Sequence, residues 1–301
     1  MRIAVLGTFL KDRIIDLQGR VTESKGGLFY SVDALRAVCA ENDQIIPISY
    51  VGKDFYRDVV LHFKGDARLK FNGLFEHDGP NNCVELKYFK PEVRTERSLN
   101  PMPPLTFAQL EPFLDADVFI FNFISGWEMN LEEFRMFASA FSGLSALDIH
   151  SLTLKRLDDG RRQWQKVANI DQWIEFVKIV HCNETEFKMV TDLDVKQFYK
   201  MFCYNQKKIV NLTYGKYGSL HVYRLGREIK WLQIQAEKRV NVVDPTGCGD
   251  VFLAGFVYFY ALGQNVKKAA QKAAVLSAVA GSVKGLPQVS LLSKKFNQLI
   301  G

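Results

Sequence analysis

The sequence predicts an α/β fold with a mainly parallel central sheet. Short apolar runs rich in β-branched residues recur along the chain and alternate with longer stretches of helical periodicity, which is the order that βαβ units produce. Most of these runs lack an alternation of polar and apolar residues, as is typical of strands buried on both faces. The composition, 48% hydrophobic and 24% charged over 301 residues, is globular and excludes disordered and fibrous chains.

The elements follow from these patterns in chain order. Each candidate strand is a short, largely apolar run: Ile3–Leu6, Ile45–Val51, Val118–Phe121, Ala146–Ile149, Ile179–Cys182, Ile209–Thr213 and Leu220–Tyr223. Each candidate helix is a longer stretch between or after these runs: Ser31–Ala40, Phe55–Phe63, Leu131–Phe141, Val195–Tyr204, Cys248–Leu262 and Val266–Ser282.

Two regions break the alternation of strands and helices. Residues 13–25 are charged and alternate weakly, and residues 83–97 alternate more clearly before the proline-rich segment Pro101–Pro104. Both predict exposed strands of a small second sheet. Because the chain has no internal repeat, flexible linker or low-complexity tract, we expect a single domain over residues 1–301 with these strands inserted as a lid.

Charge and cysteine usage exclude several classes of protein. The net charge is +6 (39 basic and 33 acidic residues), and the basic pairs are scattered, whereas a nucleic-acid site needs a basic cluster. The five cysteines form no C-x-x-C pair, which argues against a zinc site and fits a reducing compartment. The longest uncharged stretch, Val251–Val266, is too short to span a bilayer. We therefore expect a cytoplasmic protein without nucleic-acid or membrane partners.

The sharpest chemical feature is a glycine turn before a long apolar helix. Gly247, Cys248 and Gly249 place backbone N–H groups at the helix N-terminus, where they stabilise anionic oxygen. Asp250 follows in the first helical turn. Such a pairing suits phosphoryl transfer to a hydroxyl, because the amides stabilise the transferring group and the carboxylate takes the acceptor's proton. An ordinary glycine turn before a helix is the alternative.

The segment Asp244–Asp250, which reads D-P-T-G-C-G-D, resembles the C-terminal signature D-T-x-G-A-G-D of the PfkB (ribokinase-like) carbohydrate kinase family. The resemblance implies a ribokinase-like three-layer α/β/α sandwich with a mainly parallel central sheet and a small β-sheet lid. It also implies that Asp250 is the catalytic base and that the amides of Gly247, Cys248 and Gly249 form the anion hole.

Further motifs occur in the family's order. Asn183 and Glu186 match N-x-x-E, and the resemblance implies that they position Mg²⁺ and phosphate, Glu186 through water. Thr213, Gly215 and Gly218 resemble the T-x-G-x-x-G turn that meets the nucleotide. From the residues alone, N-x-x-E is also a capping box with Asn183 as the N-cap, and the two interpretations are compatible.

The residues expected to bind the acceptor match the family's pattern less closely. Asp12 resembles the aspartate that binds substrate hydroxyls after the first strand, and Gly26 and Gly27 resemble the G-G that opens the first helix and lines the sugar site. However, Ser31 replaces the usual asparagine of the substrate site, and Arg57 replaces the usual glycine after V-G-x-D-x-F. The motifs therefore predict the type of reaction more firmly than the identity of the acceptor.

The resemblance predicts an ATP-dependent, Mg²⁺-requiring kinase that transfers the γ-phosphate to a hydroxyl of a small sugar or sugar derivative. A nucleoside kinase of the same family is one alternative. A non-catalytic member that senses a sugar or nucleotide is another, motivated by the altered positions Ser31 and Arg57. A dinucleotide-dependent oxidoreductase is excluded because no G-x-G-x-x-G follows the first strand.

Two further expectations come from the resemblance. Family members often bind a monovalent cation such as K⁺ near the signature, and Asp244 and Thr246 are in place for it. Some relatives pair as homodimers through the lid, and the apolar residues Val84, Leu86 and Tyr88 would cover either a partner or only the substrate.

Overall fold

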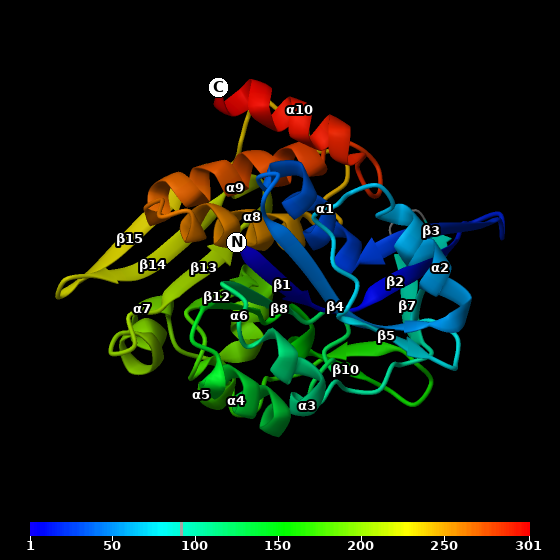
Figure 1. The fold of residues 1–301 in the computed structure, drawn as a ribbon, viewed down its shortest axis with the longest axis horizontal. Coiled ribbons are helices and arrows are strands. Elements are labelled where there is room, and N and C mark those ends of the chain that lie inside the picture. The colour runs from blue at the N-terminus through cyan, green and yellow to red at the C-terminus, as the bar shows by residue number, and fades with distance from the viewer. Residues whose placement is uncertain (91–92) are drawn as a thin grey trace.

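The computed structural model describes residues 1–90 and 93–301, and it has the α/β architecture that the sequence predicts (Figure 1). The central sheet consists of nine strands in the order β15 (Glu228–Ile234), β14 (Ser219–Leu225), β13 (Ile209–Thr213), β12 (Ile179–Asn183), β9 (Leu144–Asp148), β8 (Val118–Asn122), β1 (Arg2–Leu6), β4 (Gln44–Gly52) and β5 (Leu74–His77). Pairing is parallel from β13 to β5, whereas β14 and β15 are antiparallel.

Helices cover both faces of this sheet, as Figure 1 shows. One face packs against α1 (Leu28–Val38), α2 (Lys53–His62), α8 (Cys248–Ala261), α9 (Val266–Ala280) and α10 (Val289–Ile300). The other face packs against α3 (Phe107–Leu110), α4 (Leu131–Ala140), α5 (Ile170–Ile174), α6 (Glu184–Val190) and α7 (Val195–Phe198).

The central strands are continuously apolar because both of their faces are buried. In β1, Ile3 and Val5 belong to the hydrophobic core on the α8 side, whereas Ala4 and Leu6 belong to the core on the α4 side. Successive strand residues point to opposite faces of a sheet, so a strand covered by helices on both sides needs apolar residues at every position. The three-layer arrangement that was expected is therefore confirmed.

A four-stranded sheet lies beside the central one, in the order β3 (Val21–Gly27), β2 (Phe9–Ile15), β6 (Cys83–Lys90) and β7 (Val93–Leu99). We call it the lid sheet. The strands predicted at 13–25 and 83–97 fall in it, although β2 begins earlier, at Phe9, and a turn separates β2 from β3. Residues 91 and 92 of the predicted strand lie outside the described residues.

A hairpin of β10 (Leu154–Arg156) and β11 (Arg162–Trp164) docks on the lid sheet. The N–H of Ser98 in β7 donates to the Gly160 carbonyl oxygen in the hairpin turn at 2.7 Å. The sequence did not predict this hairpin, because its two strands have only three residues each and carry no periodic pattern.

Several predicted boundaries differ from the structure. Helix α1 begins at Leu28 rather than at Ser31, because Gly27 is its N-cap. The segment predicted as the helix 195–204 is α7 followed by a π-helical turn, Tyr199–Cys203. Short 3₁₀ turns lie at Glu111–Phe113, His150–Thr153 and Gly215–Tyr217.

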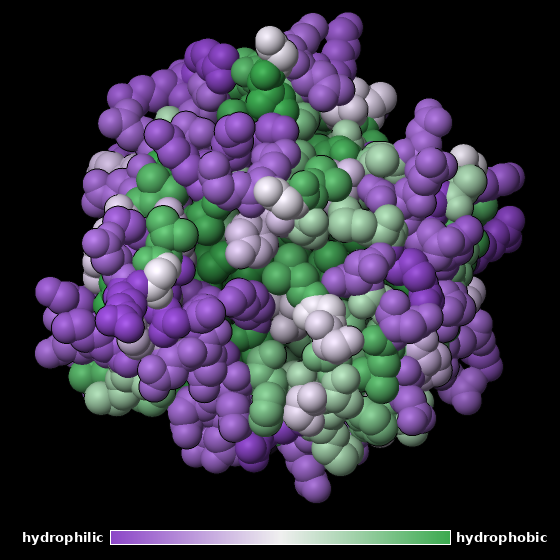
Figure 2. All heavy atoms as spheres, turned by 60° about the vertical axis from the view of Figure 1, so that its left-hand side comes forward, coloured by the Kyte–Doolittle hydropathy of each residue, from purple (hydrophilic) through white to green (hydrophobic). Residues whose placement is uncertain are grey.

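The molecular surface is mixed in character. On the face shown in Figure 2, hydrophilic side chains surround a central area of apolar and intermediate residues. Within the described part of the chain, no helix combines the length and the apolar character needed to cross a membrane.

Candidate active site

Polar side chains end four neighbouring parallel strands of the central sheet. Asn122, Asp148, Asn183 and Thr213 are the last residues of β8, β9, β12 and β13. Strand pairing sets Asn122 opposite Asp148 and Asn183 opposite Thr213. Ligands of open α/β sheets bind outside the carboxyl ends of the strands, so this edge is the natural place for a site.

Asp250, in the first turn of α8, points toward this edge. The side-chain N–H of Asn122 donates to Asp250 Oδ1 at 2.9 Å and to Ser31 Oγ at 2.6 Å. Burial raises the pKa of Asp250 to about 6, and the charge of Asp148 adds to the shift. The carboxylate is therefore ionised at neutral pH and has a pKa close to the pH at which a general base works best.

The glycine turn before α8 leaves helix N–H groups available. Gly247 is the N-cap of α8 with φ 73°, and the N–H of Cys248 donates to the Pro245 carbonyl oxygen at 3.1 Å. Among the described residues, the N–H groups of Gly247 and Gly249 have no hydrogen-bond partner. Two of the three amides predicted for an anion hole are thus free, whereas that of Cys248 is engaged within the turn.

The side chains around this turn are closely packed. A Cβ on Gly247 would lie 2.2 Å from Cδ1 of the Tyr30 ring, so Tyr30 rests directly on the glycine. The Cys248 thiol lies 3.5 Å from the Ser277 carbonyl oxygen, and burial raises the pKa of this thiol. Cys248 is therefore a packed thiol rather than an activated one.

Asn183 and Glu186 form the capping box that opens α6. Asn183 Oδ1 accepts from the Glu186 N–H at 2.9 Å, and Glu186 Oε2 accepts from the Asn183 N–H at 2.7 Å. His150 Nδ1 contacts Glu186 Oε1. Desolvation opposes the charged form of His150, although its side chain is half exposed, and the contact with Glu186 and the nearby carboxylates outweigh it and raise the pKa of His150 to about 9.

A second acid–histidine pair is buried beside the first. His181 Nδ1 lies 3.4 Å from Asp148 Oδ2, and both side chains are almost fully buried. Burial opposes ionisation of either partner, but their attraction lowers the pKa of Asp148 and raises that of His181. The charges of Asp148, His150 and His181 act on Asp250 at the carboxyl edge of the sheet.

The turn after β13 brings one of its two glycines close to the backbone of β15. Gly218 has φ 100°, and a Cβ there would lie 2.0 Å from the Ile234 carbonyl oxygen of β15. Gly215, with φ 53°, opens the turn without such a contact. The glycine at 218 is thus required by the close approach of two strands, next to the edge that carries Asn183 and Thr213.

Hydrogen bonds to Asp244 hold the segment before the glycine turn in place. Its carboxylate accepts hydrogen bonds from the Thr246 N–H at 3.0 Å and from the Gly285 N–H at 2.9 Å. These contacts join the signature loop to the segment after α9. A monovalent cation held by Asp244 and Thr246 stays a prediction.

Among the residues predicted to bind the acceptor, Asp12 lies on β2 of the lid sheet. A Cβ on Gly26 would lie 2.2 Å from Asp12 Oδ2, and one on Gly27 would lie 2.4 Å from the Thr8 carbonyl oxygen. Both glycines therefore make room for close approaches here. Ser31, predicted to contact the acceptor, is only 1% exposed and bonds to Asn122. Ser31 thus supports the Asn122–Asp250 contact, and its contact with the acceptor stays a prediction.

Burial disfavours the charged form of the Asp12 carboxyl group. Burial raises the pKa of Asp12 to about 7, with the charge of Glu96 adding to the shift. Because this pKa lies above the unfolded value of 3.8, the carboxyl favours folding while it is protonated, and that contribution is lost as the pH rises through 7. We expect Asp12→Asn to gain stability over the wild type by about 2 kcal/mol between about pH 5 and about pH 8. Chemical denaturation of both proteins at the two pH values measures it, and an equal difference at both would contradict it.

Sequence reasoning missed four members of this site: Asn122, Asp148, His150 and His181. A signal was present, because each lies within or directly after an apolar strand run, where a polar residue is out of pattern. The carboxyl ends of parallel strands meet at one edge, so polar residues at the ends of several such runs point to one site.

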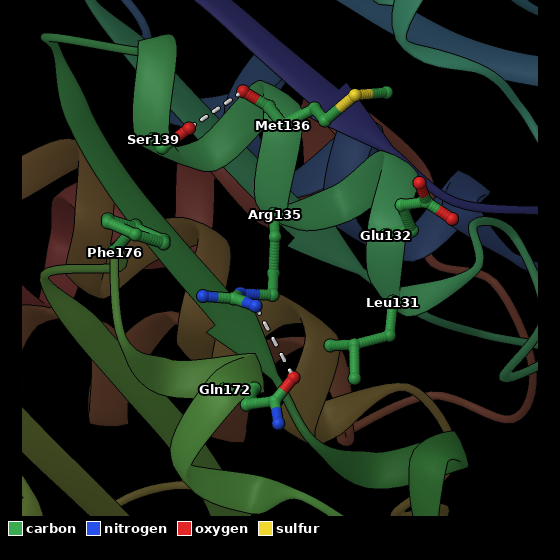
Figure 3. A pocket seen from close by; sticks show the side chains of 7 residues that line it. All are labelled: Leu131, Glu132, Arg135, Met136, Ser139, Gln172 and Phe176. Carbon is green, nitrogen blue, oxygen red and sulfur yellow. Dashed lines mark hydrogen bonds between the residues drawn. The ribbon is translucent and has the colours of Figure 1, made fainter.

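A cavity of about 480 Å³ lies elsewhere, between α4 and α5. Figure 3 shows Arg135 and Gln172 facing each other across it, with Arg135 Nη1 and Gln172 Oε1 3.5 Å apart. Its lining residues come from α4, α5 and Phe176, and none of them ends a strand at the carboxyl edge. We therefore place the candidate site at Asp250.

Comparison with known proteins agrees with this geometry. Residues 153–290 match the model of the pfkB family carbohydrate kinases, which confirms the predicted resemblance over this part of the chain. A cytidine kinase from Thermococcus kodakarensis is 37% identical over 93 residues, or 31% of this chain. The match spans only 32% of the length of that kinase.

Solved structures confirm the ribokinase-like fold. A fructokinase from Xylella fastidiosa with bound ATP superposes with a TM-score of 0.77 at 15% identity, covering 100% of this chain and 99% of the other. A pyrophosphate-dependent kinase in the ribokinase family, in complex with sulfate, gives a TM-score of 0.76 at 14% identity and covers 96% of this chain and 99% of its own.

Proposed function

We propose that this chain is a pfkB-family kinase that transfers the γ-phosphate of ATP to a hydroxyl of a small sugar or sugar derivative. One observation carries the proposal: the Asp250 carboxylate lies beside free N–H groups at the N-terminus of α8, on the carboxyl edge of a parallel sheet. Phosphoryl transfer needs a base for the acceptor hydroxyl and fixed donors for the charge on the transferring group.

The roles follow from the contacts. Asp250 takes the proton of the acceptor hydroxyl, and Asn122 holds the carboxylate in place through its 2.9 Å hydrogen bond. The N–H groups of Gly247 and Gly249 stabilise the transferring phosphoryl group. Asp12 accepts hydrogen bonds from acceptor hydroxyls, and the turn from Thr213 to Gly218 contacts the donor nucleotide.

The side chains near Asp250 fit a hydrated Mg²⁺ ion. This ion prefers oxygen ligands, keeps several waters and takes inner ligands from substrate phosphates. Glu186 and Asn183 supply carboxylate and amide oxygens, and because Glu186 already contacts Asn183 and His150, they would hold the ion through water. When bound, Mg²⁺ neutralises phosphate charge.

Three features support alternatives to this proposal. The cytidine kinase relative favours a nucleoside as acceptor, and the pyrophosphate-dependent structural neighbour makes pyrophosphate a second donor to test. A sensing protein without turnover is the third possibility, because the acceptor side departs from the family at Ser31 and Arg57.

A coupled assay across donors and acceptors tests the proposal. Purified protein is incubated with Mg²⁺ and either ATP or pyrophosphate, together with a panel of sugars, sugar derivatives and nucleosides. We expect ATP-dependent formation of a phosphorylated product, detected by mass spectrometry, with at least one acceptor. Stabilisation of the protein by a ligand without any product would instead identify a sensor.

A further inference from the structure

Three segments meet at a seam between the lid sheet and the central domain. They are β7, the loop 123–128 after β8, and the β10–β11 hairpin. Arg156 Nε donates to the Ser98 carbonyl oxygen at 2.9 Å, and Arg162 Nη2 donates to the Ser125 carbonyl oxygen at 2.8 Å. The hairpin thus bridges β7 and the loop, and this seam is lined by charged side chains that the proposed chemistry does not use.

Glu96 faces the seam from β7. Its cross-strand partner is Leu86, which packs against the cluster of Leu10, Val84 and Ile124 beneath the lid sheet. Paired residues share a face of a sheet, so Glu96 points the same way as this cluster. Its charge raises the pKa of Asp12 and opposes the lowering of the Arg162 pKa by burial, which puts Glu96 close to both. Among the described residues, the side-chain carboxylate of Glu96 has no hydrogen-bond or ion-pair partner.

Arg162 and Trp127 bring unpaired donors to the same seam. The Nη atoms of Arg162 hold the carbonyl oxygens of Ile124 and Ser125, but its Nε is buried without a partner within the described residues. The same holds for Trp127 Nε1, and the Arg162 guanidinium lies 5.9 Å from the centre of the Trp127 ring. An unsatisfied buried donor costs about 1–3 kcal/mol, so a ligand that accepts from it is favoured.

We propose that Glu96 and Arg162 determine acceptor specificity by binding the base of a nucleoside. The preferred base is a pyrimidine in which an amino group, a ring nitrogen and a carbonyl follow one another along one edge, as in cytosine. This inference rests on the proposed kinase function, with a nucleoside rather than a free sugar as the acceptor. The carboxylate of Glu96 accepts from the exocyclic amine, and the guanidinium of Arg162 donates to the ring nitrogen and the carbonyl oxygen.

The pairing follows from the donors and acceptors on each partner. Carboxylates pair with the cytosine amine, and a guanidinium makes two parallel bonds to neighbouring acceptors. Uracil has a carbonyl where cytosine has its amine, so Glu96 would face another acceptor and both would lose water without a bond. Asp12 pairs with Val84 and Glu96 with Leu86, so both acids lie on one face of the lid sheet. With the ribose hydroxyls at Asp12, the base therefore extends toward Glu96. A free pentose has no base and therefore contacts neither Glu96 nor Arg162.

The test compares cytidine, uridine and D-ribose as acceptors for the wild type, Glu96→Gln and Arg162→Gln. We expect the wild type to favour cytidine over uridine by about tenfold or more in kcat/KM. Glu96→Gln should lower that ratio about tenfold, because an amide can donate to the uracil carbonyl. Arg162→Gln should lower kcat/KM for cytidine by about 5–150-fold, the equivalent of about 1–3 kcal/mol. Because Arg162 also holds a loop, Glu96→Gln is the decisive variant.

Matched controls come from the same elements. Glu85→Gln changes a carboxylate on the outer face of the lid sheet, which pairs with Arg13 at 3.4 Å, and Arg161→Gln changes the neighbouring arginine, which pairs with Asp159. Neither should alter the cytidine to uridine ratio. Thermal shifts with each nucleoside give a readout that does not require turnover.

The outcomes separate this inference from the proposed function. Phosphorylation of sugars without any stabilisation by nucleosides keeps the kinase and overturns the inference, as does an unchanged ratio in Glu96→Gln. Cytidine-selective stabilisation that Glu96→Gln abolishes, without turnover of any acceptor, supports recognition of the base by Glu96 and overturns the kinase function.

Discussion

Replacement of Asp250 by asparagine is expected to lower kcat by about 10²–10⁴-fold while the protein stays folded, because general-base catalysis contributes a factor of that size. Asparagine keeps the shape of the side chain and an oxygen that can accept the Asn122 hydrogen bond. It cannot take a proton from an acceptor hydroxyl. The loss should therefore appear in kcat with little change in the KM for ATP, as measured by steady-state kinetics with the best acceptor from the panel.

Asp192→Asn is the control for this substitution, because Asp192 lies at the surface and pairs with Lys166. It should retain wild-type kinetics. If Asp250→Asn kept its rate within tenfold of the wild type, Asp250 would not be the base. The pH profile gives an independent check: since burial raises the pKa of Asp250 to about 6, wild-type kcat should fall about tenfold per pH unit below that value as the carboxylate becomes protonated.

The sequence predicted the central sheet well, for a physical reason. Runs such as Val118–Phe121 are apolar at every position because helices cover both faces of the sheet, so short apolar runs between helical stretches were sufficient evidence. Short elements were missed, because a helix such as Ile170–Ile174 or a strand such as Arg162–Trp164 is too short to show a period. The lid sheet was predicted only in outline, since β2 continues from the first strand with little break.

The candidate site was predictable where a local motif carries it and not where distant segments meet. The capping box of Asn183 and Glu186 and the helix start at Cys248 follow from residues close together in the chain. The contact of Asn122 with Asp250 joins residues 128 positions apart, and no local pattern encodes it. Ser31 shows the same limit, because its burial against Asn122 depends on how α1 packs on α8.

Gly247→Ala is the second substitution with a large expected effect, because two independent constraints act on this residue. Gly247 has φ 73°, which costs a residue with a side chain about 1 kcal/mol or more. In addition, the new Cβ would lie 2.2 Å from the Tyr30 ring, so that either the ring or the turn must move. A displacement of about 1 Å at reacting groups can cost about 10²-fold in rate, and we expect a loss of that order in kcat.

Gly226→Ala separates the two constraints. Gly226 has a similar φ of 61°, but nothing lies within 4 Å of a Cβ placed there, so this variant carries the backbone strain without the collision. We expect it to lose only about 1 kcal/mol of stability and none of the activity. Adding Tyr30→Ala to Gly247→Ala removes the colliding ring, and partial recovery of kcat relative to Tyr30→Ala alone would show that the collision moves the turn. If Gly247→Ala and Gly226→Ala were equally active and equally destabilised, backbone strain would be the whole effect, and the collision with Tyr30 would not displace the turn.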